Sequence, residues 1–205
     1  MSHSFDQKLG GRDFDEVLFN HFAAQFNEKH KNDVYSNARA SVRLRASCEK
    51  VKKVPGANAE APLSIECLIG DTDVRGIITR EEFENLSSKL LERVVVPCRM
   101  ALKDSGLSVD ELYTIELVGS GSRVLAITRK LTSFLKKEPT RTLNASECVA
   151  RGCALRCAML SPTLVVRDYK IDYSFPYSIV IPTPKREVMV FPKGSPFSKR
   201  ADDGT

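Results

Sequence analysis

Several features that assign a chain to the membrane or secreted classes are missing from this sequence of 205 residues. Tryptophan is absent, and no apolar run approaches the roughly 18 residues that a membrane-spanning helix requires. The first residues, MSHSFDQKLGG, contain no hydrophobic segment of the kind found in signal peptides. We therefore expect a cytoplasmic or nuclear location and no membrane partner.

Metal-binding and nucleophilic motifs are also scarce. The sequence has three histidines, too few for a credible Ser-His-Asp or Cys-His catalytic arrangement. The six cysteines show no Cys-x-x-Cys spacing, and without a secretory signal a disulfide framework is not expected. We predict no catalytic residue and no metal site, and we interpret the cysteines as small buried apolar residues.

Positive charge is in small excess. Lysine and arginine number 31 against 26 aspartate and glutamate residues, which gives a formal net charge of +5. The charges are interspersed along the chain, so nucleic acid is not an expected partner. Apolar residues make up 42% of the sequence, a share typical of a soluble globular domain.

The first 55 residues predict two helices. Asp13 and Asp15 follow a glycine pair and are interpreted as residues that cap a helix N-terminus. A second helix is predicted over residues 37–54, and Pro55-Gly56 should end it because proline disfavours helical geometry in the preceding residue. The apolar stripe that predicts the first helix, of about four turns, consists of Phe14, Leu18, Phe22 and Phe26.

Alternating apolar residues then predict strands over residues 63–67 and 74–78. Thr79 and Glu82 form a capping box that opens a helical stretch. This stretch should continue past Pro97 to about residue 104, where a glycine follows.

The remainder of the chain predicts a strand over 113–118, a small-residue loop over 119–122 and a helix over 124–135. Asn144 and Glu147 should cap another helix that ends near residue 160, whose small residues suit close packing against a neighbouring backbone. A domain boundary is expected at about 161–168. The short β-type runs beyond the last helix cover residues 164–171, 178–181 and 187–191.

A strand, a Gly/Ser loop and a helix N-terminus together suit a phosphate or a nucleoside, because backbone N–H groups can approach it closely. The loop at 119–123 matches neither phosphate-binding consensus, so on the pattern alone an ordinary strand-to-helix turn is the favoured interpretation. The basic end of the second helix, with Glu49, Lys50, Lys52 and Lys53, could line a ribose or a phosphate. A solvated helix face is the favoured alternative.

Five segments of the sequence carry a family resemblance. They read LGGRDFDEVLFNHF, VRLRASCEKVKK, ITREEFENL, IELVGSGSR and NASECVARGCALRCAMLSP. In this order they resemble the ATPase domain of the seventy-kilodalton heat-shock chaperones. The GSGSR loop, the ECVARGCA helix and VVRDYKIDY, which replaces an acidic leucine-rich linker, are similar to the large, hundred-and-ten-kilodalton branch. The resemblance covers about residues 9–169.

The resemblance implies an α/β fold, the second lobe of an actin-like (ribonuclease-H-like) ATPase domain, incomplete and followed by a short β-rich tail. Residues 1–161 would form a partial nucleotide-binding domain, with an upper subdomain at about 9–104 and a lower subdomain at about 106–160. Residues 162–205 would be a linker and the first strands of a substrate-binding β-domain.

The resemblance also implies a cofactor, ATP or ADP, held in the cleft between the two lobes. An arginine can stack on adenine, and glutamate and lysine can hydrogen-bond ribose hydroxyls. The residues that match adenosine-side positions are Glu49, Lys52 and Lys53 of the bracketing helix, Gly119, Ser120, Ser122 and Arg123 of the loop, Ser146, and Gly10 and Gly11 of a glycine turn beside the cleft.

Two departures from the family pattern bear on activity. Pro55-Gly56 stands where the family has Leu-Ser, so one adenine hydrogen bond, worth about 0.5–1.5 kcal/mol, would be lost. The family's phosphate loop and the aspartates that position Mg²⁺ have no counterpart in this sequence, so we expect no ATP hydrolysis by these residues alone. The lower subdomain would also lack partner strands and fold poorly, as in a truncated product.

The parent family holds unfolded client proteins, and its large branch acts as a nucleotide-exchange co-chaperone for a seventy-kilodalton partner chaperone. The resemblance implies the same for the protein to which these residues belong. The alternative interpretation is a protein-interaction fragment without a nucleotide role.

Overall fold

The computed structural model describes residues 2–31, 33–53, 58–167, 169–171, 173–184 and 186–196. The helices are α1 (Gly11–His30), α2 (Ala38–Lys53), α3 (Arg80–Leu86), α4 (Ser88–Arg93), α5 (Val95–Ser105), α6 (Leu125–Leu135) and α7 (Cys148–Leu160). The strands are β1 (Glu60–Ile69), β2 (Thr72–Thr79), β3 (Ile179–Pro182) and β4 (Glu187–Phe191).

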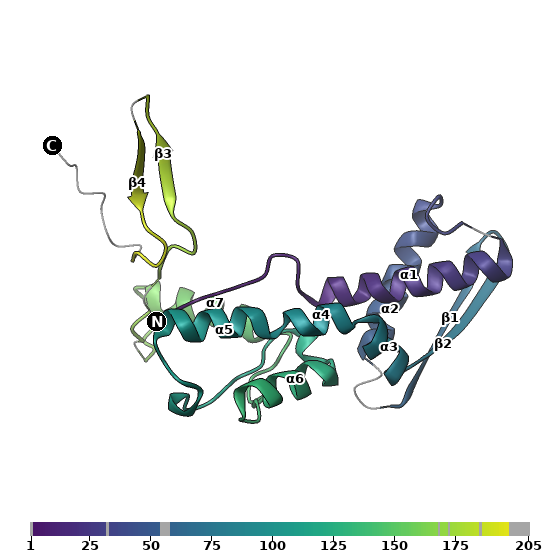
Figure 1. Ribbon diagram of the computed structural model, residues 1–205, viewed down its shortest axis with the longest axis horizontal. Helices are drawn as coiled ribbons and strands as arrows, with labels where there is room; N and C mark the ends of the chain where they lie inside the picture. Colours follow the sequence, from purple (N-terminus) through teal and green to yellow (C-terminus); the bar gives the residue numbers. More distant parts are fainter. Residues whose placement is uncertain are drawn as a thin grey trace.

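One apolar core holds together α1 to α4, the β1–β2 hairpin and the start of α6. Figure 1 shows α1, α2 and the β1–β2 hairpin at one end of the molecule, with α4, α5 and α6 next to them. Buried residues from α1, α2, both strands of that hairpin, α3, α4 and the start of α6 form a single cluster. Among the described residues, no helix combines the length and the apolar character needed to cross a lipid bilayer.

The predicted stripe is confirmed in α1, where Phe14, Leu18, Phe22 and Phe26 are all buried. Phe19 is buried as well and widens the stripe. Each such side chain contributes about 1.5–3 kcal/mol on burial, so α1 is the main apolar element of the core.

The second predicted helix is also confirmed. Its N-terminus is capped by Asn37, whose Oδ1 accepts a hydrogen bond from the Ala40 amide at 3.0 Å. Leu44, Cys48 and Val51 follow at helical spacing and are buried. The predicted stop at Pro55-Gly56 lies outside the described residues.

The two predicted strands form an antiparallel hairpin with Leu63 opposite Gly76 and Ile65 opposite Val74. Burial alternates along both strands, so one face packs on the core. Beyond Ile65 the register shifts at a bulge that contains Cys67 in the left-handed region. The Arg43 guanidinium on α2 donates to the Glu66 and Cys67 carbonyls at 2.7 and 2.6 Å, which fixes the bulge to the helix.

The helical stretch after the hairpin begins as predicted, since Thr79 Oγ1 accepts from the Glu82 amide at 3.1 Å. It is interrupted at Ser87 and at Val94, so three short helices replace one long helix. The last of them ends at Gly106, whose φ of 71° suits glycine at a helix C-terminus.

The strand predicted over 113–118 is wrong. One isolated parallel bridge, between Glu116 and Thr140, is present in this part of the described chain, and Tyr113 is 97% exposed. An apolar alternating sequence becomes a strand only when a neighbouring strand pairs with its backbone. The helix predicted to follow the loop is confirmed as α6.

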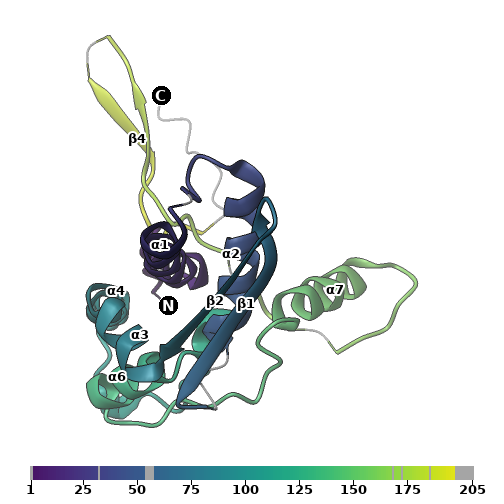
Figure 2. The ribbon, with the colours of Figure 1, turned by 90° about the vertical axis from the view of Figure 1, so that its right-hand side faces the viewer.

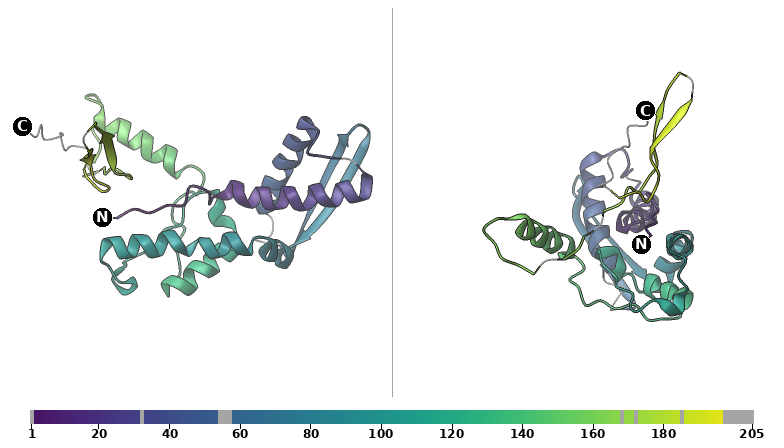
Figure 3. Two further views of the ribbon diagram at one scale, coloured as in Figure 1. Left: turned by 45° about the horizontal axis from the view of Figure 1, so that its top comes forward. Right: turned by 90° about the vertical axis from the view of Figure 1, so that its left-hand side faces the viewer.

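Helix α7 has the predicted span, but it buries no residue. Figures 2 and 3 show it projecting away from α1 to α6, and a Cβ placed on Gly152 would meet no atom within 4 Å. The close packing expected from its small residues is therefore not present. The interpretation of the cysteines as buried residues is correct for Cys48 and wrong for Cys67, Cys153 and Cys157, which are exposed free thiols.

In the tail, the β-type runs at 178–181 and 187–191 form the antiparallel β3–β4 hairpin. Residues 164–167 are not in a strand. Tyr177 anchors the base of this hairpin by packing edge-to-face on Phe5 and by accepting a hydrogen bond from Gln7 at 2.8 Å. The division into subdomains, linker and substrate domain remains a prediction.

Replacement of Gly76 tests the packing of α1 on the hairpin. An added Cβ would lie 2.6 Å from the Phe22 ring, so Gly76→Ala overpacks the core. We expect it to lower the free energy of unfolding by about 1–3 kcal/mol, measured by native-state hydrogen exchange of α1 amides.

Gly152→Ala is the matched control, because the added methyl group there meets open space on an exposed helix. It should leave α1 exchange unchanged and favour α7 by about 0.5–1 kcal/mol. Equal exchange of α1 amides in Gly76→Ala and wild type would show that Phe22 does not pack against β2.

Candidate functional site

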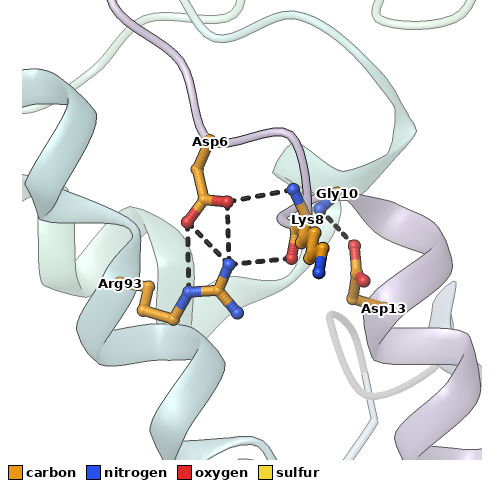
Figure 4. Close-up of polar contacts among 5 residues, drawn as sticks. All are labelled: Asp6, Lys8, Gly10, Asp13 and Arg93. Atoms are coloured by element: carbon orange, nitrogen blue, oxygen red, sulfur yellow. Dashed lines mark hydrogen bonds and ion pairs between the residues drawn. The ribbon is translucent and has the colours of Figure 1, made fainter.

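A polar network holds the turn that precedes α1 (Figure 4). The Arg93 guanidinium on α4 donates to the Asp6 carboxylate at 2.6–3.1 Å and to the Lys8 carbonyl at 3.0 Å. Asp6 also accepts from the Lys8 amide at 2.9 Å. The Arg93 guanidinium, and then the Lys8 amide, hold the pKa of the Asp6 carboxyl below its ordinary value.

Gly10, in the predicted glycine turn, forms the N-cap of α1. Its amide donates to Asp13 Oδ2 at 2.7 Å, so the capping role predicted for Asp13 is confirmed. This contact is also drawn in Figure 4. The prediction for Asp15 is wrong, because its carboxylate faces the second helix and forms an ion pair there.

The partner of Asp15 is Lys52, which is 3% exposed at the end of α2. The Lys52 ammonium lies 2.7 Å from Asp15 Oδ1 and donates to the Gly11 carbonyl at 2.9 Å. Glycine at position 11 leaves room for this contact, since a Cβ there would lie 3.1 Å from the ammonium nitrogen. Lys52 thus joins the two helices at the glycine turn, and both of its contacts are internal.

The Gly/Ser loop approaches the same turn. Gly119 starts it with a φ of 87°, and Ser120–Arg123 form the 3₁₀ turn η2. A Cβ on Gly121 would lie 3.4 Å from the Gly11 nitrogen and 3.5 Å from its Cα, so the space between the two backbones is about the size of one methyl group. Gly121 was not among the predicted site residues, although the second glycine of GSGSR is the signal that could have identified it.

The loop also brings Ser146 into the site. The Gly119 amide donates to the Ala145 carbonyl at 2.9 Å, and the Arg123 guanidinium lies 3.4 Å from Ser146 Oγ. Ser122 is buried and donates its hydroxyl to the Gly119 carbonyl at 2.7 Å, so it shapes the loop. Ser120 and Arg123 are exposed and can meet a ligand.

Glu49 and Lys53 lie on the exposed side of α2 and pair with each other at 3.1 Å. This contact with Lys53 lowers the pKa of Glu49. Within the described part of the chain, no hydrogen bond or ion pair joins either residue to the loop. The structure therefore unites Gly10, Gly11 and Lys52 with the loop, and places Glu49 and Lys53 one helical turn or less from Lys52.

The resemblance implies that the adenosine and phosphate side of a nucleotide binds here, and this remains a prediction. Exposed Arg123 offers a planar cation for a base, and the glycine backbones leave room for close approach. No group of three or more His, Cys, Asp or Glu side chains gathers in the described residues. The expected absence of a metal site remains a prediction, because Mg²⁺ commonly binds through one or two carboxylates, water and the phosphates of a nucleotide.

Comparison with known proteins shows the family to which this chain is related. A family model described as Hsp70 protein matches residues 1–191. The chain is 62% identical over 203 residues to heat shock 70 kDa protein 16 of Arabidopsis thaliana, covering 96% of the chain and 26% of that protein. It is 46% identical over 180 residues to heat shock 70 kDa protein 4 of Homo sapiens and to the 97 kDa heat shock protein of Mesocentrotus franciscanus. Each of these two matches covers 87% of this chain, and 21% and 20% of the respective relative, so the chain spans about a quarter or less of their lengths.

Removal of the Lys52 ammonium should destabilise the site strongly. Lys52→Met leaves the largely buried Asp15 carboxylate without its partner, and such a loss costs about 3 kcal/mol. The measurement is the urea midpoint of the α1 and α2 amide signals in NMR spectra.

Lys53→Met is the control, since it removes the same charge from an exposed i,i+4 pair worth about 0.5 kcal/mol or less. Similar urea midpoints for the two variants would contradict a buried ion pair between Lys52 and Asp15.

The Asp6–Arg93 contact should make the glycine turn sensitive to acid. Because the folded pKa of Asp6 is depressed, its contribution to stability is complete above the ordinary value of 3.8 and is lost as the pH falls through the folded pKa. We expect the stability advantage of wild type over Asp6→Asn to be constant at neutral pH and to shrink below about pH 4. Unfolding of both proteins as a function of pH checks this, and a constant difference down to pH 2 would refute it.

Proposed function

Because the chain belongs to the Hsp70 protein family, we propose that its described residues form the adenosine-facing part of an ATP- and ADP-binding site in a molecular chaperone. The observation that carries the proposal is the approach of Gly121 to Gly11, whose carbonyl accepts a hydrogen bond from the buried Lys52 ammonium. The GSGSR loop, the glycine turn and the end of α2 thus lie close together, and the family resemblance implies that a nucleoside binds beside them.

The helices and strands can also be assigned to subdomains of the family's ATPase domain and of its substrate-binding domain. We propose that α1 to α5 with the β1–β2 hairpin belong to the upper subdomain of the second lobe of an actin-like domain. The segment from 106 to 160 would belong to the lower subdomain, and the β3–β4 hairpin to a substrate-binding β-domain. The mixed helices and small sheets of the structure are compatible with this assignment.

The cellular role is proposed from the relatives. The similarity to the 97 kDa heat shock protein supports membership of the large branch. A protein of that branch would hold unfolded clients and assist nucleotide exchange on a seventy-kilodalton partner chaperone in the cytoplasm or nucleus. Magnesium would accompany the nucleotide through groups other than those described.

Nucleotide binding is the direct test. We expect ATP or ADP with Mg²⁺ to stabilise the chain, by about 2.7 kcal/mol at a nucleotide concentration of one hundred times Kd. Arg123→Ala should weaken binding about tenfold by removing the stacking cation, as measured by isothermal titration calorimetry.

Arg151→Ala provides the matched control, because Arg151 is exposed on α7 and pairs with Glu147. It should bind nucleotide as wild type does. No binding by the wild-type chain would overturn the proposal and favour the alternative, a protein-interaction fragment. Equal affinities of wild type and Arg123→Ala would remove Arg123 from the site.

A further inference from the structure

We propose that Arg141 is a positioning residue that sets the shape of the Gly119–Arg123 loop for its ligand. The proposal rests on the proposed function, in which this loop holds a nucleotide. No motif in the sequence marks Arg141, and it lies in the connection between α6 and α7, outside the sequence segments that match the family's site residues.

The Arg141 guanidinium connects the loop to α6. Arg141 Nη2, which carries two hydrogens, donates to the Ser122 carbonyl at 2.8 Å and to the Thr128 hydroxyl. Both acceptors are buried, with Ser122 8% and Thr128 9% exposed. One nitrogen thus links the backbone of the loop to the side of α6, and a charged donor to a buried acceptor forms a strong hydrogen bond.

Hydrogen bonds to a neighbouring segment also hold the backbone next to Arg141. The neighbouring Thr140 accepts from the Leu117 amide at 2.9 Å and donates its own amide to the Ile115 carbonyl at 2.7 Å. Glu116 accepts from the Thr140 hydroxyl and from the Leu143 amide, and the Thr140 contact in particular lowers the pKa of its carboxyl. The segment 140–143 therefore lies rigidly along 115–117, which leads directly into the loop.

The same segment continues to Ala145 and Ser146, which contact the part of the loop that would face the nucleotide. The Ala145 carbonyl accepts the Gly119 amide, and Ser146 lies beside Arg123. Residues 140–146 thus contact the loop at its start, through Gly119, and at Ser122, and they contribute Ser146 to the site. Because a loop held in its binding conformation loses less entropy when the ligand arrives, these contacts should raise nucleotide affinity.

Variants at position 141 test the proposal in two measurements on the whole chain. In the absence of nucleotide, Arg141→Ala should accelerate hydrogen exchange at the Ser122 and Val124 amides, which bond to the Gly119 and Gly121 carbonyls. In calorimetry it should bind ATP about tenfold more weakly, equivalent to about 1.4 kcal/mol. Amides of α1 and β2 should exchange as in wild type, which separates a local effect from general unfolding.

Three further arms define the role. Arg141→Lys keeps the charge and a donor nitrogen but loses the planar guanidinium, so its exchange rates and affinity should lie between those of wild type and Arg141→Ala. Millimolar guanidinium ion should restore part of the affinity of Arg141→Ala, which a purely structural loss would not show. Arg151→Ala removes the same charge from α7 and should change neither measurement.

The outcomes are distinguishable. If wild type binds ATP and Arg141→Ala matches it in affinity, the inference is overturned while the proposed function stands. If wild type binds no nucleotide, the proposed function fails, and the exchange rates still decide whether Arg141 orders the loop. Unchanged exchange at Ser122 and Val124 would overturn the positioning role in either case.

Discussion

The arrangement of the site depends on a buried ammonium group. Lys52 leaves water at the end of α2, and the cost of burying its charge is offset by the Asp15 carboxylate and the Gly11 carbonyl. Both acceptors belong to the first turn and a half of α1, so the pair fixes the angle and the distance at which the two helices meet. The apolar packing of α1 and α2 alone would tolerate small sliding movements, whereas an ion pair with two acceptors permits one register.

The position of α1 also determines where the loop lies, because Gly11 and Gly121 have no side chains to keep the two segments apart. A Cβ on Gly11 would lie 3.1 Å from the Lys52 ammonium nitrogen and 3.8 Å from the Gly121 nitrogen and Cα, so the ammonium group and the loop approach the same side of this glycine. Arg141 and the Ala145 carbonyl also hold the loop. The candidate site therefore lies where the core-bound part of the chain meets the less buried part, and its geometry is set by polar contacts and glycines.

Periodicity was sufficient to predict the elements that bury one face. The α1 stripe, the buried face of α2, the β1–β2 hairpin and α6 each contain their signal within a short window of sequence. The strand predicted at 113–118 was wrong because a strand needs a partner that local sequence does not specify. The ion pair of Asp15 and the contacts of Arg141 were not predicted for the same reason, since ion pairs and bonds to buried acceptors arise only when distant segments meet. Gly121 was overlooked although the GSGSR motif contains it. The ligand roles predicted for Glu49, Lys52, Lys53, Ser146, the glycine turn and the loop all remain predictions.

The isolation of α7 has a consequence for how this chain loses its structure. A 13-residue helix that buries no side chain gains little from tertiary packing, and isolated helices of that length are marginal in water. The core around α1, in contrast, gains its stability from many mutually dependent apolar contacts and should open as one cooperative unit. Heating should then produce a gradual helix–coil change in α7 and a separate, sharper transition in the core. A single melting temperature would not describe this chain, and circular dichroism would report a different midpoint from any probe placed among the phenylalanines.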